Sequence, residues 1–476
     1  MLVLFYASVL LLNFIRREGS SKSEFVDFDP KKAITGEEQE SLPEARVATK
    51  KQKVYGFIDL RGDLVGEILP GNAFYVYQNI GKSSRCKDGV GQLGEAAYIC
   101  LRDTEVTSET PVVLPEIINF VPPSPEVAKT EEYKKSKTWP ELVGKGDQPF
   151  MPSVHGLARR TRKVLHESVA AFEQGTGRKF DLPSGRTYAF LNAISTVRGW
   201  ALQRFDGKVM ALEDVKLYPV DRFAGRKMLE HPSPENTVPG FVYRSGAKIY
   251  SAANVKSDVI RQAKKREALD VLPESSGGFY EIPSIDGTAQ KGYVRVRDIR
   301  KWIPKPPPSF AEDDEIWIDI IVSQQMLSVY KGSAQLFTTL VSTAGEGHIT
   351  PSGVFNIYLK NSHSHMSAWD KTKNRYKYYL EKVPWVMYYY HSYAIHSAFW
   401  HTDYGRPRSH GCINLSLTDV KYVFDMVNPQ LPAGWTSVLG SADNMGTVIR
   451  VRKKDEDVAD LRSSSIKELT ENRSKE

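Results

Sequence analysis

The 476-residue sequence has few cysteines, little net charge and no long apolar run after its first residues. The net charge is +7, from 64 Lys+Arg and 57 Asp+Glu, which is small for a nucleic-acid-binding chain of this length. We therefore expect no nucleic acid as a partner. The lack of an apolar run of about 18 residues beyond the N-terminus excludes a protein with several membrane-spanning helices. Hydrophobic residues make up 41% of the chain, which excludes a mainly disordered protein.

The three cysteines are unevenly placed along the chain. Cys86 and Cys100 lie 14 residues apart in an N-terminal segment, and Cys412 stands alone near the other end. In an oxidising compartment the first two can form a disulfide and leave one free thiol. Two unrelated buried thiols would give the same spacing, so both interpretations stay open.

The first residues indicate the compartment. Residues 1–15, MLVLFYASVLLLNFI, carry no charged side chain and are followed by Arg16 and Arg17. Fifteen apolar residues match the core of a signal peptide better than a full membrane span, although a basic leader and a small-x-small cleavage site are missing. We predict an exported protein of the periplasm or cell envelope, in which residues 1–17 are a signal peptide or a short membrane anchor.

Composition divides the rest of the chain into small β modules and linkers, so the predicted fold class is mainly β with some α. In segment 51–108, apolar and polar residues alternate between Gly-containing turns, which predicts short strands. We expect, in order, a polar tether (18–50), a small β module (51–120), a linker (121–153), a segment of helix and β structure (154–235), a second small β module (236–303), a Pro-rich linker (304–314), a β-rich domain (315–452) and a charged tail (453–476).

Two segments give more specific predictions. Apolar residues at helical spacing predict a helix at about 154–174, with Gly175 as its stop. Beyond the Pro-rich linker, IWIDIIV (316–322) and MLSVYKG (326–332) predict a hairpin, and LFTTLVSTA (336–344) predicts a third strand.

The stretch 239–303 resembles a bacterial SH3-like barrel, a small module common in secreted cell-wall proteins. The resemblance rests on its alternating pattern, from GFVYRSGAKIY to GYVRVRDIRKWI. We expect the module at 51–120 to be of the same kind.

The sequence becomes specific in AIHSAFWHTDYGRPRSHGCINLS, residues 394–416. His396 precedes Cys412 by 16 positions, and an imidazole within hydrogen-bond reach of a thiol can take its proton and later return it to a leaving amine. A backbone carbonyl can fix the tautomer of that ring. Gly411 lets the backbone approach a substrate closely, and N–H groups there can stabilise an oxyanion. Polar residues surround Cys412 in the sequence, unlike a buried core cysteine, so we predict a cysteine nucleophile.

A metal site is the alternative chemistry for this segment. Four histidines and one cysteine fall within 22 residues, namely His391, His396, His401, His410 and Cys412. Structural zinc sites prefer closely spaced ligand pairs, and only one cysteine is present here. We therefore expect no metal ion. Thiol acyl transfer needs only a base and oxyanion donors, so we expect no cofactor either.

These residues resemble the catalytic signature of the L,D-transpeptidase family, the YkuD-type domain: a His, then a gap, then [S/T]-H-G-C-x-N. His396 and the run from Ser409 to Asn414 satisfy every position of this signature. Thr350-Pro351-Ser352-Gly353 matches the family's T-P-x-G turn, and the resemblance covers about 315–452. It implies a mostly β catalytic domain.

The resemblance implies acyl transfer on the stem peptides of peptidoglycan. Cys412 would attack the carbonyl of the L-centre of diaminopimelate and expel the terminal D-Ala, and an amine of a second stem would resolve the thioester into a 3→3 cross-link. Carbapenem-type β-lactams would acylate the same thiol. With water or a protein lysine as acceptor, the enzyme would be an L,D-carboxypeptidase or a protein-attachment enzyme. A wall-binding protein without catalysis is the remaining alternative.

The same resemblance assigns the catalytic roles. Cys412 would be the nucleophile and His396 the general base and acid, with the backbone carbonyl of Ser397 orienting its imidazole. His410 and Gly411 would shape the nucleophile loop and the oxyanion site.

It also assigns the residues around the nucleophile. Asn414 would support the loop, and Ser409 and Arg408 would join it in substrate binding. His391 and His401 match no catalytic position of the family, and we expect surface or lid roles for them.

Two flanking segments complete the prediction. The polar, Tyr-rich segment 360–382 resembles a substrate-covering lid, and an ordinary solvated loop is the alternative. After the nucleophile, Ser416 can cap a helix, with Asp419 completing a capping-box-like pair. The apolar face of this helix would consist of Val420, Val423, Phe424 and Val427.

Overall fold

The computed structural model describes most of the chain from residue 43 onward. The described residues are 43–61, 64–94, 96–111, 119–121, 154–158, 165–177, 179–180, 186–218, 221–308, 311, 314–370, 372, 375–440 and 446–463. The predictions for residues 1–17, for most of the tether and most of the linker at 121–153, and for the end of the tail lie outside them. Among the described residues, no helix combines the length and apolar character needed to cross a bilayer.

The first described segment consists of short β-strands. Strand β1 pairs antiparallel with β4 and β8, while β2 pairs with β3 and β7. Its strands are β1 (Glu44–Ala48), β2 (Gln52–Tyr55), β3 (Leu64–Ile68), β4 (Ala73–Val76), β5 (Gln78–Gly81), β6 (Val90–Gly94), β7 (Ala97–Cys100) and β8 (Thr104–Val106). Strand β1 begins inside the segment predicted as tether, because its backbone completes the sheet between β4 and β8. The SH3-like assignment stays a prediction.

The next segment corrects the helix predicted at 154–174. Residues Val154–Ala158 form strand β10, which lies between β13 and β16, and Leu165–His166 form β11. A run of apolar residues this short fits a strand as well as a helix, and long-range backbone pairing decides between them. Within the described residues of 154–174, α5 (Val169–Gln174) is the one helix, and Gly175 ends it with φ 65°, as predicted.

The other strands of this segment are β9 (Asn119–Val121), β12 (Lys179–Phe180), β13 (Thr187–Thr196), β14 (Gly199–Arg204), β15 (Val209–Ala211) and β16 (Val215–Leu217).

The third segment contains two small sheets, ordered β21-β18-β25 and β20-β19-β24-β23-β22. Their strands are β18 (Val238–Val242), β19 (Lys248–Tyr250), β20 (Val259–Gln262), β21 (Ala268–Val271), β22 (Ser275–Ser276), β23 (Phe279–Ile282), β24 (Gly292–Arg295) and β25 (Ile299–Lys301). Two arginines of this module bond to the loop that leads to Cys412. Arg266 donates to the Thr402 carbonyl at 3.1 Å, and Arg300 donates to the Gly405 carbonyl at 2.9 Å.

The C-terminal domain is built on two sheets. The first has the order β17-β28-β27-β26-β35-β29, and the predicted hairpin and third strand are confirmed in it. Its strands are β17 (Arg226–Lys227), β26 (Ile316–Ile321), β27 (Met326–Lys331), β28 (Ala334–Leu340), β29 (Gly353–Asn356) and β35 (Val448–Arg452). Strands β26 and β27 are buried on both faces, because their successive side chains enter two different hydrophobic clusters.

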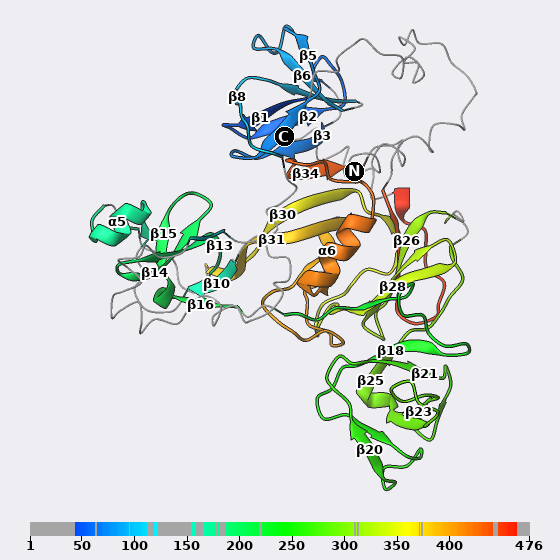
Figure 1. The fold of residues 1–476 in the computed structure, drawn as a ribbon. Coiled ribbons are helices and arrows are strands. Elements are labelled where there is room, and N and C mark those ends of the chain that lie inside the picture. Colours follow the sequence, from blue (N-terminus) through cyan, green and yellow to red (C-terminus); the bar gives the residue numbers. More distant parts are fainter. Residues whose placement is uncertain are drawn as a thin grey trace, which may run out of the picture. The chain divides into compact units, whose positions relative to one another are not determined.

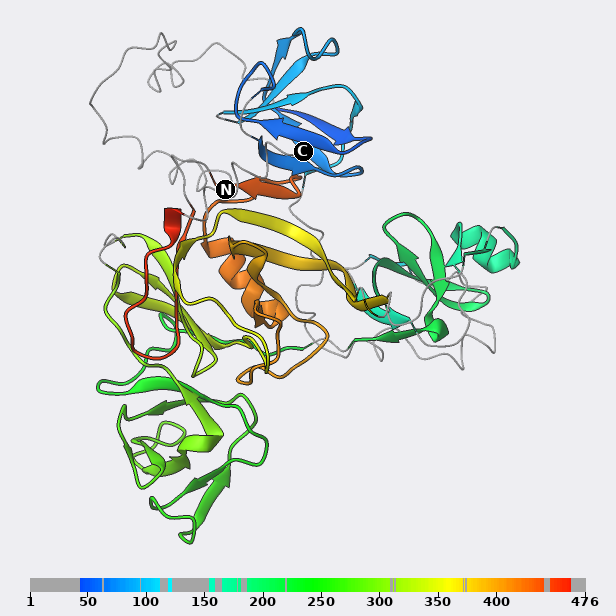
Figure 2. The same ribbon diagram turned by 180° about the vertical axis from the view of Figure 1, so that it is seen from behind.

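The second sheet carries the candidate site. Strand β34 pairs with β30, β30 with β31, β31 with β32, and β32 with β33. Its strands are β30 (Leu359–Asp370), β31 (Arg375–Tyr390), β32 (Tyr393–Ser397), β33 (Ile413–Leu415) and β34 (Ser437–Leu439). Strands β30 and β31 form a long hairpin, drawn in yellow (Figure 1, Figure 2).

Helix α6 (Leu417–Met426) packs on β31 and β32 and lies against the hairpin in both views (Figure 1, Figure 2). Ser416 caps it by accepting a hydrogen bond from the Asp419 N–H at 3.1 Å, as predicted. At its other end, the buried Lys360 Nζ donates to the carbonyls of Phe424 and Val427, each at 2.7 Å. These bonds satisfy carbonyl groups that a helix end leaves without partners. The helix therefore holds the segment that follows Cys412.

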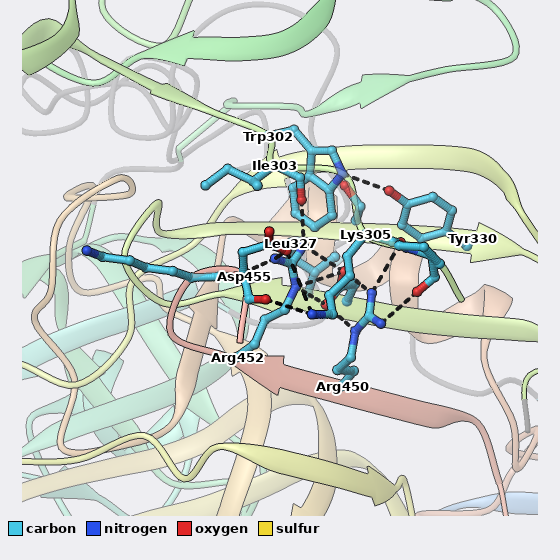
Figure 3. Close-up of polar contacts among 12 residues, drawn as sticks. Trp302, Ile303, Lys305, Leu327, Tyr330, Arg450, Arg452 and Asp455 are labelled. Atoms are coloured by element: carbon cyan, nitrogen blue, oxygen red, sulfur yellow. Dashed lines mark hydrogen bonds and ion pairs between the residues drawn. The ribbon is translucent and has the colours of Figure 1, made fainter. Parts of the chain in front are cut away.

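A buried ionic cluster joins the Pro-rich segment to the first sheet. Asp319 is fully buried and accepts hydrogen bonds from Arg450 (2.6 Å) and Arg452 (3.0 Å). The same guanidinium groups also bind linker carbonyls, with Arg452 on Ile303 at 2.5 Å and Arg450 on Pro306 at 2.8 Å (Figure 3). The segment predicted as a free linker is thus bonded along its backbone to the C-terminal domain.

The predicted charged tail also differs in part from expectation. The backbone of Val354 in β29 accepts a hydrogen bond from Leu461 and donates one to Ala459, each at 2.8 Å. The described start of the tail therefore extends the first sheet at its edge, because β29 has free backbone groups there.

Candidate active site

The backbone register of β32 and β33 brings the predicted residues together. These strands are parallel, and Ile395 pairs with Ile413 and His396 with Asn414. Continuing this register by one residue places Cys412 beside Ala394. The side chains of His396 and Asn414 lie on one face of the sheet, because directly paired residues of neighbouring strands point the same way. Cys412 directly precedes β33, two residues before Asn414.

The His396 imidazole is held in one tautomer. Its Nδ1 donates to the Ser397 carbonyl at 2.8 Å, the partner that the resemblance implied. Its Nε2 lies 3.1 Å from Asn414 Nδ2. Burial lowers the pKa of His396 to about 4, although the bond to Ser397 opposes this shift. The ring is therefore neutral at neutral pH, with an unprotonated Nε2 that can act as a base.

The Cys412 thiol is the one free cysteine among the described residues, and its side chain is partly exposed. Its Sγ lies 3.8 Å from the Ser392 carbonyl oxygen. Among the described residues, no hydrogen bond joins Cys412 Sγ directly to His396.

The loop before Cys412 is fixed by two hydroxyl groups. Ser409 Oγ donates to the Cys412 carbonyl at 2.5 Å and accepts from the Gly411 N–H at 3.0 Å. Thr350, from the T-P-x-G turn, donates to the Gly411 carbonyl at 2.8 Å. Gly411 has φ 136°, and a Cβ there would lie 2.3 Å from the Tyr393 ring, so only glycine fits. The Ser409 hydroxyl and the Gly411 N–H therefore bind within the loop rather than facing outward.

The remaining predicted site residues lie at the edge of this loop. Arg408 is paired with Asp403 at 2.6 Å, and more than half of its side chain is exposed. The His410 ring lies 4.4 Å from the ring of His348 and 5.3 Å from that of Tyr378, measured between centroids. His410 therefore forms a contact between the nucleophile loop and the β30–β31 hairpin.

That hairpin corrects the alternative of an ordinary solvated loop at 360–382. Residues on both sides of its turn are paired strands, and Leu380 also pairs with Thr187 of β13. Glu381 is bound by Arg204 at 3.1 Å. The backbone forms strands here because alternate side chains find buried partners on two sides. The role of the hairpin as a lid stays a prediction.

Sequence reasoning missed three residues near the nucleophile: His348, Tyr378 and His401. His401 is buried and bonded to Asn414, which corrects the surface role expected for it. The adjacent tyrosines in KYYLEK are the one local signal that could have indicated a strand rather than a loop at Tyr378. His391, in contrast, is exposed, in line with the surface role predicted for it.

The other two cysteines are far from this site in the sequence. Cys86 and Cys100 form a disulfide in the first β module. Across the described ranges, one group of three metal-ligating side chains lies close together, namely Cys86, Asp88 and Cys100, and both of its sulfur atoms are in the disulfide.

Residues 314–451 match the family model of the L,D-transpeptidase catalytic domain, YkuD. The two-sheet domain with its Cys-His site is thus a YkuD domain, and its bounds agree with the predicted 315–452 to within one residue at each end.

Solved structures of L,D-transpeptidases are similar to the chain. The enzyme from Stackebrandtia nassauensis is 21% identical, with 31% of this chain and 62% of that chain covered and a TM-score of 0.21. The catalytic domain from E. faecium is 21% identical, with 29% and 98% covered and a TM-score of 0.23. An enzyme from Mycobacterium tuberculosis H37Rv is 17% identical, with 44% and 76% covered and a TM-score of 0.22. The chain thus spans less than two thirds of the Stackebrandtia protein. No curated protein matches the chain.

A first prediction concerns the pH dependence of the reactivity of the Cys412 thiol. Burial raises the pKa of Cys412 above its usual range, so the thiolate fraction at about pH 7.5 is smaller than for a free cysteine. We expect alkylation by iodoacetamide to be slower in the folded protein than in the urea-unfolded chain, and its rate to keep rising above about pH 9. The adduct is measured by mass spectrometry. Faster alkylation of the folded protein at neutral pH would contradict this prediction.

Proposed function

We propose that this protein is an exported cysteine L,D-transpeptidase that forms 3→3 cross-links between peptidoglycan stem peptides. The observation that carries the proposal is a neutral His396, bonded through Nε2 to Asn414 two residues after Cys412, within a segment that matches the L,D-transpeptidase catalytic domain. Export and a place in the periplasm or cell envelope are supported by the apolar residues 1–15.

The reaction proceeds in two halves. His396 Nε2 takes the Cys412 proton, and the sulfur attacks the carbonyl carbon of the L-centre of diaminopimelate. The C–N bond to D-Ala breaks, and the imidazolium returns the proton to that leaving amine. An amine of a second stem then attacks the thioester, and the thiol is regenerated as the new amide bond forms. Donors at the loop that carries Cys412 would stabilise the oxyanion of each tetrahedral intermediate.

The acyl acceptor distinguishes this enzyme from its alternatives on the same scaffold. Water gives an L,D-carboxypeptidase, and a protein lysine gives an attachment enzyme. A non-catalytic wall-binding protein needs neither an intact Cys412 nor a base, and the bonds that hold His396 in its basic tautomer favour an enzyme.

The experiment is incubation of the purified protein with muropeptides that carry tetrapeptide stems, followed by mass spectrometry. A dimer with the mass of two stems less one D-Ala supports transpeptidation. A tripeptide stem without dimer indicates the carboxypeptidase. Ertapenem, which acylates the E. faecium catalytic domain, serves as the probe of the thiol, and an adduct of one molecule is expected. Unchanged muropeptides and no adduct would refute the enzyme.

A further inference from the structure

A chain of side-chain hydrogen bonds runs from His401 to the catalytic base. His401 lies on the loop after β32 and is 7% exposed. Its Nδ1 accepts from the Asp403 N–H at 3.2 Å, and its Nε2 lies 3.2 Å from Asn414 Oδ1. The same amide reaches His396 Nε2 through Nδ2 at 3.1 Å, and His396 Nδ1 reaches the Ser397 carbonyl at 2.8 Å.

The direction of every bond in this chain follows from its two ends. At one end, a backbone N–H can only donate, so His401 Nδ1 is the acceptor and its proton is on Nε2. At the other end, a carbonyl can only accept, so His396 carries its proton on Nδ1 and has a lone pair on Nε2. Burial lowers the pKa of His401, which keeps that ring neutral too. Both ends independently require Asn414 to present its oxygen to His401 and its NH₂ to His396.

We propose that His401 is a positioning residue for the transfer reaction, which orients the Asn414 amide so that its NH₂ group donates to His396 Nε2 and keeps that nitrogen unprotonated. The inference rests on the proposed function, because it assigns a role within that same site. His401 itself transfers no proton. The proton moves from Cys412 Sγ to His396 Nε2 and then to the leaving amine.

This chain of hydrogen bonds excludes the tautomer of His396 that carries its proton on Nε2. If Asn414 were free to turn by 180° about its amide, its oxygen would face His396 Nε2 and favour a proton there. A ring protonated on Nε2 and neutral cannot take the thiol proton. The hydrogen bond from His401 opposes that turn, because the NH₂ group would then face the His401 Nε2–H. Fixing the amide thus keeps the base ready before substrate arrives.

Two substitutions distinguish the roles of the two ring nitrogen atoms of His401. His401→Gln keeps a side-chain NH₂ at the place of Nε2, whereas His401→Asn keeps an oxygen at the place of Nδ1 and loses the donor to Asn414. His231→Asn is the matched control, because His231 is exposed and lies outside the catalytic domain. We expect His401→Asn to slow ertapenem acylation by about tenfold or more, and His401→Gln to recover most of that loss, to within roughly threefold of the control.

The second readout is the ¹⁵N NMR shift of His396, which reports its tautomer without any need for turnover. We expect the Nδ1–H tautomer in the wild type and in His401→Gln, and a mixture of tautomers in His401→Asn. A single Nδ1–H tautomer in all variants, or equal acylation rates for His401→Asn and the control, would overturn the inference. If the wild type forms no ertapenem adduct at all, the proposed function fails. The NMR measurement of the His396 tautomer still tests the role of His401 in that case. Thermal melting of each variant identifies a loss caused by misfolding.

Discussion

Replacing Cys412 with Ala is expected to remove both the ertapenem adduct and every cross-linked or hydrolysed muropeptide, a loss of at least about a thousandfold in rate. The proposed reaction requires a thioester on this sulfur, and Cys86 and Cys100 are joined in a disulfide and cannot replace it. Muropeptide mass spectrometry measures the effect.

The control for this variant is Ser275→Ala, an exposed position on β22 outside the catalytic domain, which should leave the products unchanged. Cys412→Ala should still sediment with purified cell walls, because the wall binding expected of the N-terminal modules would not involve the thiol. If Cys412→Ala yields the same muropeptides as the wild type, the protein does not act through this cysteine.

Replacing Asp319 with Asn is expected to destabilise the protein by about 3–5 kcal/mol. Asp319 is fully buried between the guanidinium groups of Arg450 and Arg452, which are themselves almost fully buried. An amide of the same shape removes the negative charge and turns an NH₂ group toward donors, so two positive charges remain buried without compensation. Urea unfolding, followed by fluorescence, measures the change in the free energy of unfolding.

Asp425→Asn is the matched control for this prediction. Asp425 forms an ion pair with Lys421 one turn away on α6, and more than half of its side chain is exposed. Exposed pairs of this kind contribute little, so we expect a loss below about 0.5 kcal/mol. Equal and small losses for both variants would show that Asp319 is not needed to balance the two arginines.

Local patterns predicted the elements that depend mainly on nearby residues. Short β-forming runs predicted the strands that became β26, β27 and β28, and Ser416 followed by Asp419 predicted the start of α6. The Ser397 carbonyl as the partner of His396 was implied by the resemblance to the YkuD-type domain.

Elements that depend on distant partners were not predictable in the same way. The apolar residues of β10 read equally well as a helix, and its pairing with β13 and β16 involves residues 30 or more positions away. Asp319 lies 131 residues from Arg450, and no periodicity connects them. His401 has no fixed place in the motif, and only the path of the loop brings it to Asn414.

The hydrogen bonds from Arg450 and Arg452 to the Pro-rich segment limit where a fragment that contains the catalytic domain can begin. A fragment that begins at residue 315 would lack the carbonyl groups of Ile303 and Pro306. It would also lack Trp302, whose indole N–H donates to the Tyr330 hydroxyl at 2.7 Å. Arg450 and Arg452 would then depend more heavily on Asp319 and on water. A catalytic fragment that keeps these hydrogen bonds therefore has to start near residue 300 or earlier, ahead of the prolines.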